Sequence, residues 1–130
     1  SSDVCSSDLD DIGQRLRHHA HIASTWLRRP DVQAIMRQLQ AVQDRFPDLV
    51  ATMHEAGYLY FVGVIAADIA AAARRDGVPA RDPDRVARTL VSAIAGYQVQ
   101  ERMGGELSES DVQAQEAFIV DMLIRSRPAW

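Results

Sequence analysis

The sequence has little that would cross-link the chain or interrupt a helix. Only one of its 130 residues, Cys5, is a cysteine, so no disulfide framework can form within the chain. It has five prolines and seven glycines, and long stretches contain neither, which favours helices over a loop-rich fold. Lysine and asparagine do not occur, so all 14 basic residues are arginine.

The chain also lacks the excess of positive charge that nucleic-acid binding needs. It carries 18 acidic and 14 basic residues, a formal net charge of -4. A domain that grips phosphate backbones is usually basic, with arginine and lysine gathered on one face. We therefore expect these residues alone not to bind DNA specifically. The single cysteine and the absence of a signal-peptide pattern at the start favour a cytoplasmic location.

The first nine residues differ in composition from everything that follows. They contain four serines and the only cysteine, and the string resembles a translated sequencing-adaptor remnant. We exclude residues 1–9 from the fold argument, with a native flexible terminus as the alternative. Residues 10–130 are then expected to form one domain, since about 100–200 residues is the usual size.

Apolar residues recur at steps of three and four along nearly the whole of that domain, which is typical of amphipathic helices. Proline and glycine divide the pattern, Asp31 is a candidate helix cap, and Ser108 to Asp111 resembles a capping box. No segment alternates like a strand. We predict an all-α, antiparallel bundle of about five main helices, over residues 10–28, 31–46, 47–76, 83–103 and 108–127.

The third of these helices is apolar nearly all round, which predicts a central buried helix. Its segment from Ala56 to Ala73 has 18 residues and one charge, Asp68. A membrane span needs about 20 predominantly apolar residues. Asp68 near the centre would cost roughly 2.5–3.5 kcal/mol on insertion. We therefore expect no membrane span.

A family resemblance lies in the last third of the chain, in the residues that end one helix and begin the next. Residues 73–78 read Ala-Arg-Arg-Asp-Gly-Val, an Asp-Pro start follows at Asp82, and residues 86–98 are rich in small and aliphatic side chains. This pattern resembles the C-terminal domain of TetR-type transcriptional regulators. Two further features, Gly-Tyr-Gln at residues 96–98 and Arg-Arg-Pro-Asp-Val at residues 28–32, resemble the γ-butyrolactone-receptor branch.

The resemblance implies a homodimer that packs its last two long helices against those of a partner. Small residues on the penultimate helix, Ala87, Ala93, Ala95 and Gly96, would let helices approach closely, although ordinary packing within one subunit explains them too. It also implies that a helix-turn-helix domain, missing before Asp10, binds DNA in the intact parent repressor. The predicted interface residues are Leu90, Ile94, Phe118 and Met122.

The family places a small hydrophobic effector among the middle helices, where this chain concentrates aromatic side chains. Such a set can line an apolar pocket with a few polar handles, and plain core packing is the alternative. Asp68 and Gln98, polar in apolar helices, are either satisfied within the core or contact a ligand. The predicted ligand-binding residues are Trp26, Met53, Tyr58, Phe61, Tyr97 and Gln98.

Signals for catalysis or a metal are weak. His18 and His21 share a helix face, but no Cys partner and no His-Glu-x-x-His motif accompanies them. No phosphate loop or nucleophile elbow occurs. We predict no cofactor, no metal and no enzyme activity. The alternatives to a sensing domain are a stand-alone helical-bundle interaction or storage module without ligand, and a small all-α enzyme.

Overall fold

A computed structural model describes residues 11–130, and the prediction for residues 1–9 lies outside this range. Helices α4 and α5 are joined by a π-helical turn into one helix that runs from Pro47 to Asp76. Residues 11–130 thus form five main helices and no strand, which confirms the all-α prediction. The elements are α2 Ile12–Leu27, α3 Pro30–Val42, α4 Pro47–His54, the π-turn Glu55–Leu59, α5 Tyr60–Asp76, α6 Pro83–Arg102, α7 Glu109–Arg125 and a 3-10 turn Arg127–Ala129.

Local chemistry fixes most of the helix ends. The Asp82 carboxylate accepts a hydrogen bond from the Arg85 backbone N–H at 3.0 Å, and the Ser108 hydroxyl accepts one from the Asp111 N–H at 3.1 Å. Each bond satisfies an N–H that has no partner within its own helix. Gly77 ends α5 with φ 68°, a left-handed conformation that glycine adopts without steric cost.

Asp31 does not cap α3, contrary to the sequence prediction. The helix begins with Pro30 in its first turn, so Arg29 holds the capping position and Asp31 lies inside the first turn. Proline is pre-organised for that first position and has no N–H to satisfy. The Asp31 carboxylate instead accepts two hydrogen bonds from the Arg29 guanidinium, which lower its pKa.

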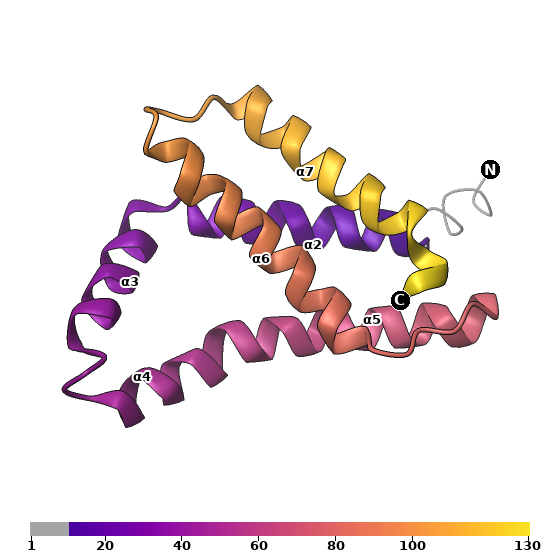
Figure 1. The fold of residues 1–130 in the computed structure, drawn as a ribbon, viewed down its shortest axis with the longest axis horizontal. Helices are drawn as coiled ribbons and strands as arrows, with labels where there is room; N and C mark the ends of the chain where they lie inside the picture. The colour runs from indigo at the N-terminus through magenta and orange to yellow at the C-terminus, as the bar shows by residue number, and fades with distance from the viewer. Residues whose placement is uncertain (1–10) are drawn as a thin grey trace.

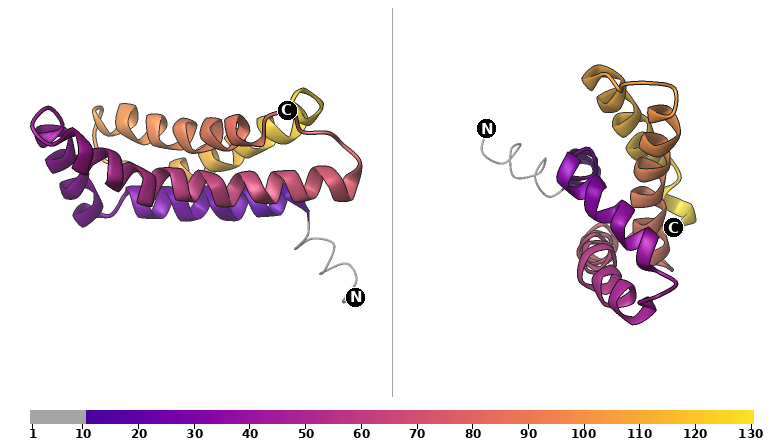
Figure 2. Two further views of the ribbon diagram at one scale, coloured as in Figure 1. Left: turned by 90° about the horizontal axis from the view of Figure 1, so that it is seen from below. Right: turned by 90° about the vertical axis from the view of Figure 1, so that its left-hand side faces the viewer.

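The helices form two layers. Seen from below, α2 and the long helix of α4 and α5 make one layer, and α6 and α7 make the other (Figures 1 and 2). The helix α6 crosses α2 and packs against α5, while α7 lies along α2 and α6. A two-layer arrangement lets each amphipathic helix bury its apolar stripe against another element.

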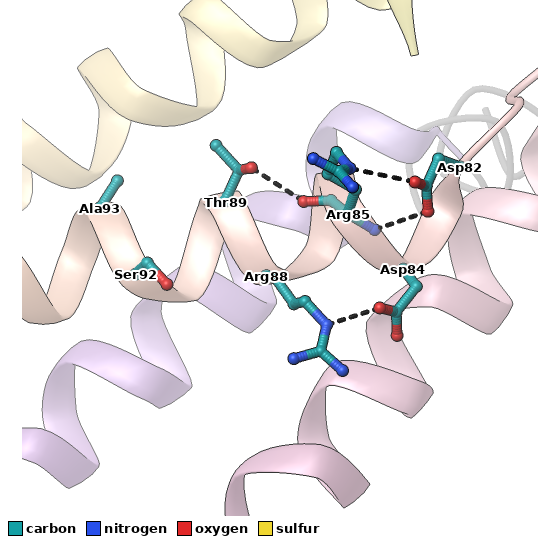
Figure 3. A pocket seen from close by; sticks show the side chains of 7 residues that line it. All are labelled: Asp82, Asp84, Arg85, Arg88, Thr89, Ser92 and Ala93. Carbon is teal, nitrogen blue, oxygen red and sulfur yellow. Dashed lines mark hydrogen bonds and ion pairs between the residues drawn. The ribbon is translucent and has the colours of Figure 1, made fainter.

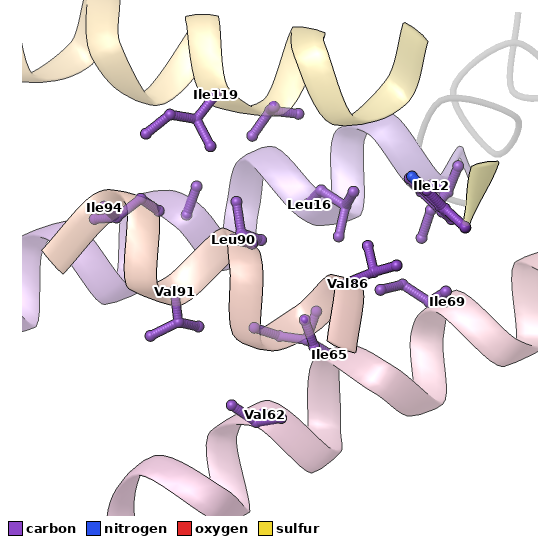
Figure 4. Packing of buried hydrophobic residues seen from close by; sticks show 14 of the residues in the cluster. Ile12, Leu16, Val62, Ile65, Ile69, Val86, Leu90, Val91, Ile94 and Ile119 are labelled. Atoms are coloured by element: carbon purple, nitrogen blue, oxygen red, sulfur yellow. The ribbon is translucent and has the colours of Figure 1, made fainter. Parts of the chain in front are cut away.

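The core lies where these layers meet (Figure 4). Its aliphatic side chains come from α2, α5, α6 and α7, and Leu16, Val62, Ile65 and Ile69 have no exposed surface at all. Burying a large aliphatic side chain contributes about 1.5–3 kcal/mol, so this cluster is the main source of stability. The C-terminal Trp130 belongs to the same cluster, and its indole N–H donates to the Leu123 carbonyl at 3.0 Å.

The long helix is not buried all round, which corrects the prediction of a central buried helix. Its α5 part buries only one stripe, Val62, Ile65, Ile69 and Ala72, whereas Tyr60 is 71% exposed and Val64 is also exposed. By length and composition alone, Pro47–Asp76 would suffice to cross a membrane. One helix of this length and composition is weak evidence for a span.

The helices α3 and α4 project from the rest of the molecule as a corner (Figure 1), and we call residues 30–54 the arm. Only Val32 of α3 is buried, and no residue of α4 is. The arm carries exposed apolar side chains on both helices, among them Ile35, Met36, Leu49 and Met53. Within the described chain it is the part with the fewest buried groups.

Candidate functional site

The outer face of α6 carries an unbroken stripe of small and apolar residues. Its members recur at steps of three and four, so they share one side of the helix. A Cβ added at Gly96 would meet no atom within 4 Å, so this point of the helix is open to close approach. All are exposed except Ala93, which is half-buried. We call this set the α6 stripe: Thr89, Ser92, Ala93, Gly96, Val99 and Met103.

The neighbouring helix α7 presents a second apolar stripe to solvent. Ala114, Phe118 and Met122 lie four residues apart and are all exposed, with Phe118 at 59% and Met122 at 56%. Large apolar side chains at this exposure, in line on one helix, are typical of a surface that another protein covers. We call these three residues the α7 stripe.

Leu90 and Ile94, the other two predicted interface residues, lie elsewhere. Their exposed fractions are 1% and 2%, and both pack in the core between the two layers (Figure 4). A side chain enclosed within one subunit cannot meet a partner. Of the small-residue set, Ala87 is fully buried in the core, while Ala93 and Ala95 are both half-buried.

The predicted ligand-binding residues fall into separate groups. Tyr58 and Phe61 are half-buried and pack against the core from the long helix. The Tyr58 ring stacks on His54 at 4.9 Å between centroids and lies beneath the Arg88 guanidinium at 5.9 Å. The Phe61 ring meets His19 edge-on at 5.9 Å. Trp26 and Met53, by contrast, are exposed, at 49% and 42%.

Gln98 and Tyr97 border a narrow hollow between α2, α6 and α7, which has no room for a water molecule. The Gln98 amide NH₂ donates to the Ser24 hydroxyl at 2.8 Å and to the Ser24 carbonyl at 3.1 Å. The other amide atom of Gln98, Oε1, is buried and has no protein partner. Burial and the nearby Glu101 and Asp111 carboxylates raise the pKa of Tyr97.

A larger hollow opens on the surface of α6, with a volume of about 640 Å³ (Figure 3). Its charged side chains pair along the helix, Arg85 with Asp82 and Arg88 with Asp84. Thr89, Ser92 and Ala93 of the α6 stripe complete the lining. The sequence does not predict this hollow, because no residue pattern distinguishes a shallow surface depression along an amphipathic helix. Neither hollow is lined by Trp26, Met53, Tyr58 or Phe61.

A polar contact of Asp68 joins α5 to α2. The sequence left open whether Asp68 is satisfied within the core or contacts a ligand. The Asp68 carboxylate lies 2.7 Å from Nε2 of His19 and 3.5 Å from the Arg15 guanidinium. His19 is largely buried, and its Nδ1 has no protein partner. Asp68 is therefore satisfied within the protein, as the NH₂ group of Gln98 is through Ser24. Within residues 11–130, no three His, Cys, Asp or Glu side chains form a group that could hold a metal ion.

The chain matches a known protein family over most of its length. Residues 14–126 match the family model described as AefR-like transcriptional repressor, C-terminal domain. No curated protein and no solved structure matches the chain. The matched range covers the five main helices described above except for the first two residues of α2.

Proposed function

This chain belongs to the TetR-type family of transcriptional repressors, as an AefR-like C-terminal domain, and from that premise we propose that it dimerises and senses a small hydrophobic effector. The family consists of regulators rather than enzymes. The intact parent would bind operator DNA in the cytoplasm through a helix-turn-helix domain outside these residues, and effector binding would release it.

The observation that supports dimerisation is the pair of exposed stripes on the two helices of one layer. A two-fold dimer uses the same surface of both subunits, so the α6 and α7 stripes would each meet their copies or each other. Gly96 and the small residues near it would allow two helix backbones to approach closely, and Phe118 and Met122 would supply apolar area. The proposed interface keeps Phe118 and Met122, and replaces Leu90 and Ile94 with Gly96, Val99 and Met103.

Phe118→Arg tests this proposal against a matched control. Phe118 and Phe46 are both exposed phenylalanines, at 59% and 50%, but Phe46 lies on the arm, between α3 and α4. We expect sedimentation at tens of micromolar to show a dimer for the unmutated chain and for Phe46→Arg. Phe118→Arg would sediment as a folded monomer, because it places a charge in a desolvated interface. A monomeric unmutated chain would refute the proposal.

Effector sensing is supported by the family and by the aromatic side chains of the long helix. Tyr58 offers a hydroxyl beside an apolar ring, which suits the directed hydrogen bond that fixes an apolar ligand. In Gln98, Oε1 is the side-chain atom without a protein partner, so it could accept a hydrogen bond from a ligand. We propose that the effector contacts Tyr58 and Phe61, with Trp26, Met53, Tyr97 and Gln98 reached as the helices adjust around it.

A thermal-shift screen of hydrophobic metabolites, lactones included, tests the sensing role. A ligand that prefers the folded state raises the Tm in a dose-dependent way. Tyr58→Phe removes only the hydroxyl and is expected to weaken a hit. Tyr60→Phe is the control, since Tyr60 is 71% exposed on the same helix. Equal binding to both variants would exclude Tyr58 as the polar handle.

A dimerising bundle without a ligand is the second candidate. It is favoured by one observation, that neither of the two hollows described above is lined by Trp26, Tyr58 or Phe61. If the screen yields no saturable Tm shift while sedimentation shows a dimer, this candidate replaces the sensing role.

A further inference from the structure

The long helix changes its winding at one point. Between α4 and α5, residues Glu55–Leu59 form a π-helical turn, which is wider than the α-helix on either side. Single π-turns within α-helices are rare and lie frequently at functional positions. They are also among the few identifiable causes of a helix kink.

This turn separates two segments that are anchored very differently. On its C-terminal side, α5 buries Val62, Ile65, Ile69 and Ala72 against the bundle. On its N-terminal side, α4 buries nothing and, apart from the adjoining π-turn, contacts α3, which itself buries only Val32. Segments with few buried apolar groups open at the lowest free energy. The arm is therefore the least anchored segment, and the π-turn is one of its two junctions with the bundle, the other being the short turn between α2 and α3.

The junction contains a glycine that has room for a side chain. Gly57 is exposed within the π-turn, and a Cβ built there would meet no atom within 4 Å. Glycine restricts the backbone less than any other residue, and no packing requires it here. The chain is thus least constrained where the winding changes.

Tyr58 joins this turn to the bundle, since its side chain packs against the core cluster and its ring also meets α6. Tyr58 of the π-turn lies under the guanidinium of Arg88 on α6, while its ring also stacks on His54 at the end of α4. The attraction between a cation and an aromatic face is worth about 0.5–1 kcal/mol at exposed sites. The contact can therefore favour one position of the arm without making it rigid.

We propose that the arm swings as a unit about the π-turn at residues 55–59, with the contact of Tyr58 with Arg88 as its latch. The motion would admit the effector to Tyr58 and bring Met53 of the arm toward it. This purpose rests on the proposed sensing function, but the motion belongs to the effector-free protein and is measured there.

Spin-label distances test the motion in the full chain. In a Cys5→Ser background, Gln40→Cys on the arm is paired with Gln14→Cys on α2, and the control pair is Gln14→Cys with Gln100→Cys on α6. All three glutamines are exposed, and dilution with unlabelled protein suppresses distances between subunits. We expect a broader distance distribution for the arm pair than for the control pair. Equally narrow distributions would overturn the proposal.

Two matched substitutions locate the hinge. Gly63 is also an exposed helical glycine with an empty surrounding, but it lies in α5. Gly57→Ala should narrow the arm distribution and slow amide exchange in residues 47–59 roughly three- to fivefold, the factor given by the helix preference of alanine over glycine. Gly63→Ala should change neither. If both variants narrow the distribution equally, the π-turn is not the hinge.

Arg88→Gln tests the latch, with Arg85→Gln as its control. Both arginines pair with an aspartate on α6, but of the two it is Arg88 whose guanidinium lies over Tyr58. We expect Arg88→Gln to broaden the arm distribution further and Arg85→Gln to leave it unchanged. If the two variants gave the same distance distribution for the arm pair, the contact of Arg88 with Tyr58 would not restrain the arm. A rigid arm in a chain that still binds an effector would refute the hinge while leaving the sensing function intact.

Discussion

The amide NH₂ of Gln98 donates to the Ser24 hydroxyl at 2.8 Å, across 74 positions of sequence, and joins α6 to α2 inside the protein. Gln98 is 2% exposed and Ser24 is fully buried. A buried polar pair of this kind adds little net stability when complete, but it is costly to leave half made. Gln98 is therefore a structural residue first, and any role toward a ligand falls to its Oε1 atom.

Gln98→Leu should lower the free energy of unfolding by about 1–3 kcal/mol, because it leaves the Ser24 hydroxyl buried without its partner. Ser24→Ala should also destabilise. The double variant should lose less than the sum of the two, as expected for residues that share one interaction. Urea denaturation of the four proteins measures this, and strict additivity would show that the bond contributes nothing.

Asp68→Ala should destabilise the protein by about 1–3 kcal/mol, since it removes the acceptor 2.7 Å from Nε2 of the largely buried His19. Asp121→Ala is the control, because Asp121 pairs with Arg125 on the exposed face of α7. Exposed pairs one helical turn apart contribute little, so we expect almost no change there. An equal loss of stability in both variants would mean that the contact between α2 and α5 stabilises the fold no more than an exposed ion pair does.

Stability should fall as the solution is acidified, in part through Glu109. The hydrogen bond from the Arg28 guanidinium at 2.8 Å holds the pKa of Glu109 below its usual 4.5 in the folded protein. A carboxyl with a depressed folded pKa stabilises the fold above its unfolded pKa, and the contribution is lost as the pH falls through the folded value. Asp76 and Asp82, whose pKa values arginine contacts also lower, act in the same direction.

Glu109→Gln tests the contribution of Glu109 to this pH dependence of stability. It should lower the urea midpoint slightly at neutral pH and give a shallower loss below about pH 4.5, so that the two curves converge in acid. The control is Glu106→Gln, an exposed glutamate in the preceding loop. High salt should reduce the difference, since exposed charges are screened. A pH profile for Glu109→Gln that runs parallel to that of the unmutated chain would contradict the assignment.

The sequence by itself determined the helices, because helix ends depend on neighbouring residues. Ser108 and Asp82 cap the helices that follow them, Pro47 begins another, and Gly77 supplies the left-handed step after α5. These signals act within four residues, so the number of helices and most of their bounds follow from reading along the chain. The end of α3 does not, since it lies at Val42 and not near Phe46 as the sequence predicts. Asp31 shows a second limit, since with Pro30 in the first turn the cap lies two residues earlier than predicted, at Arg29.

The tertiary structure alone decided which face of each helix is covered. The helix α6 is apolar on two sides, and periodicity does not say which side its neighbours take. Its crossing of α2 and α5 buries Leu90 and Ile94 and leaves Val99 and Met103 outside. The same holds for the partner of Asp68, since His19 lies 49 positions away along the chain. Contacts at such separations depend on how two rigid helices pack, and no local pattern records that choice.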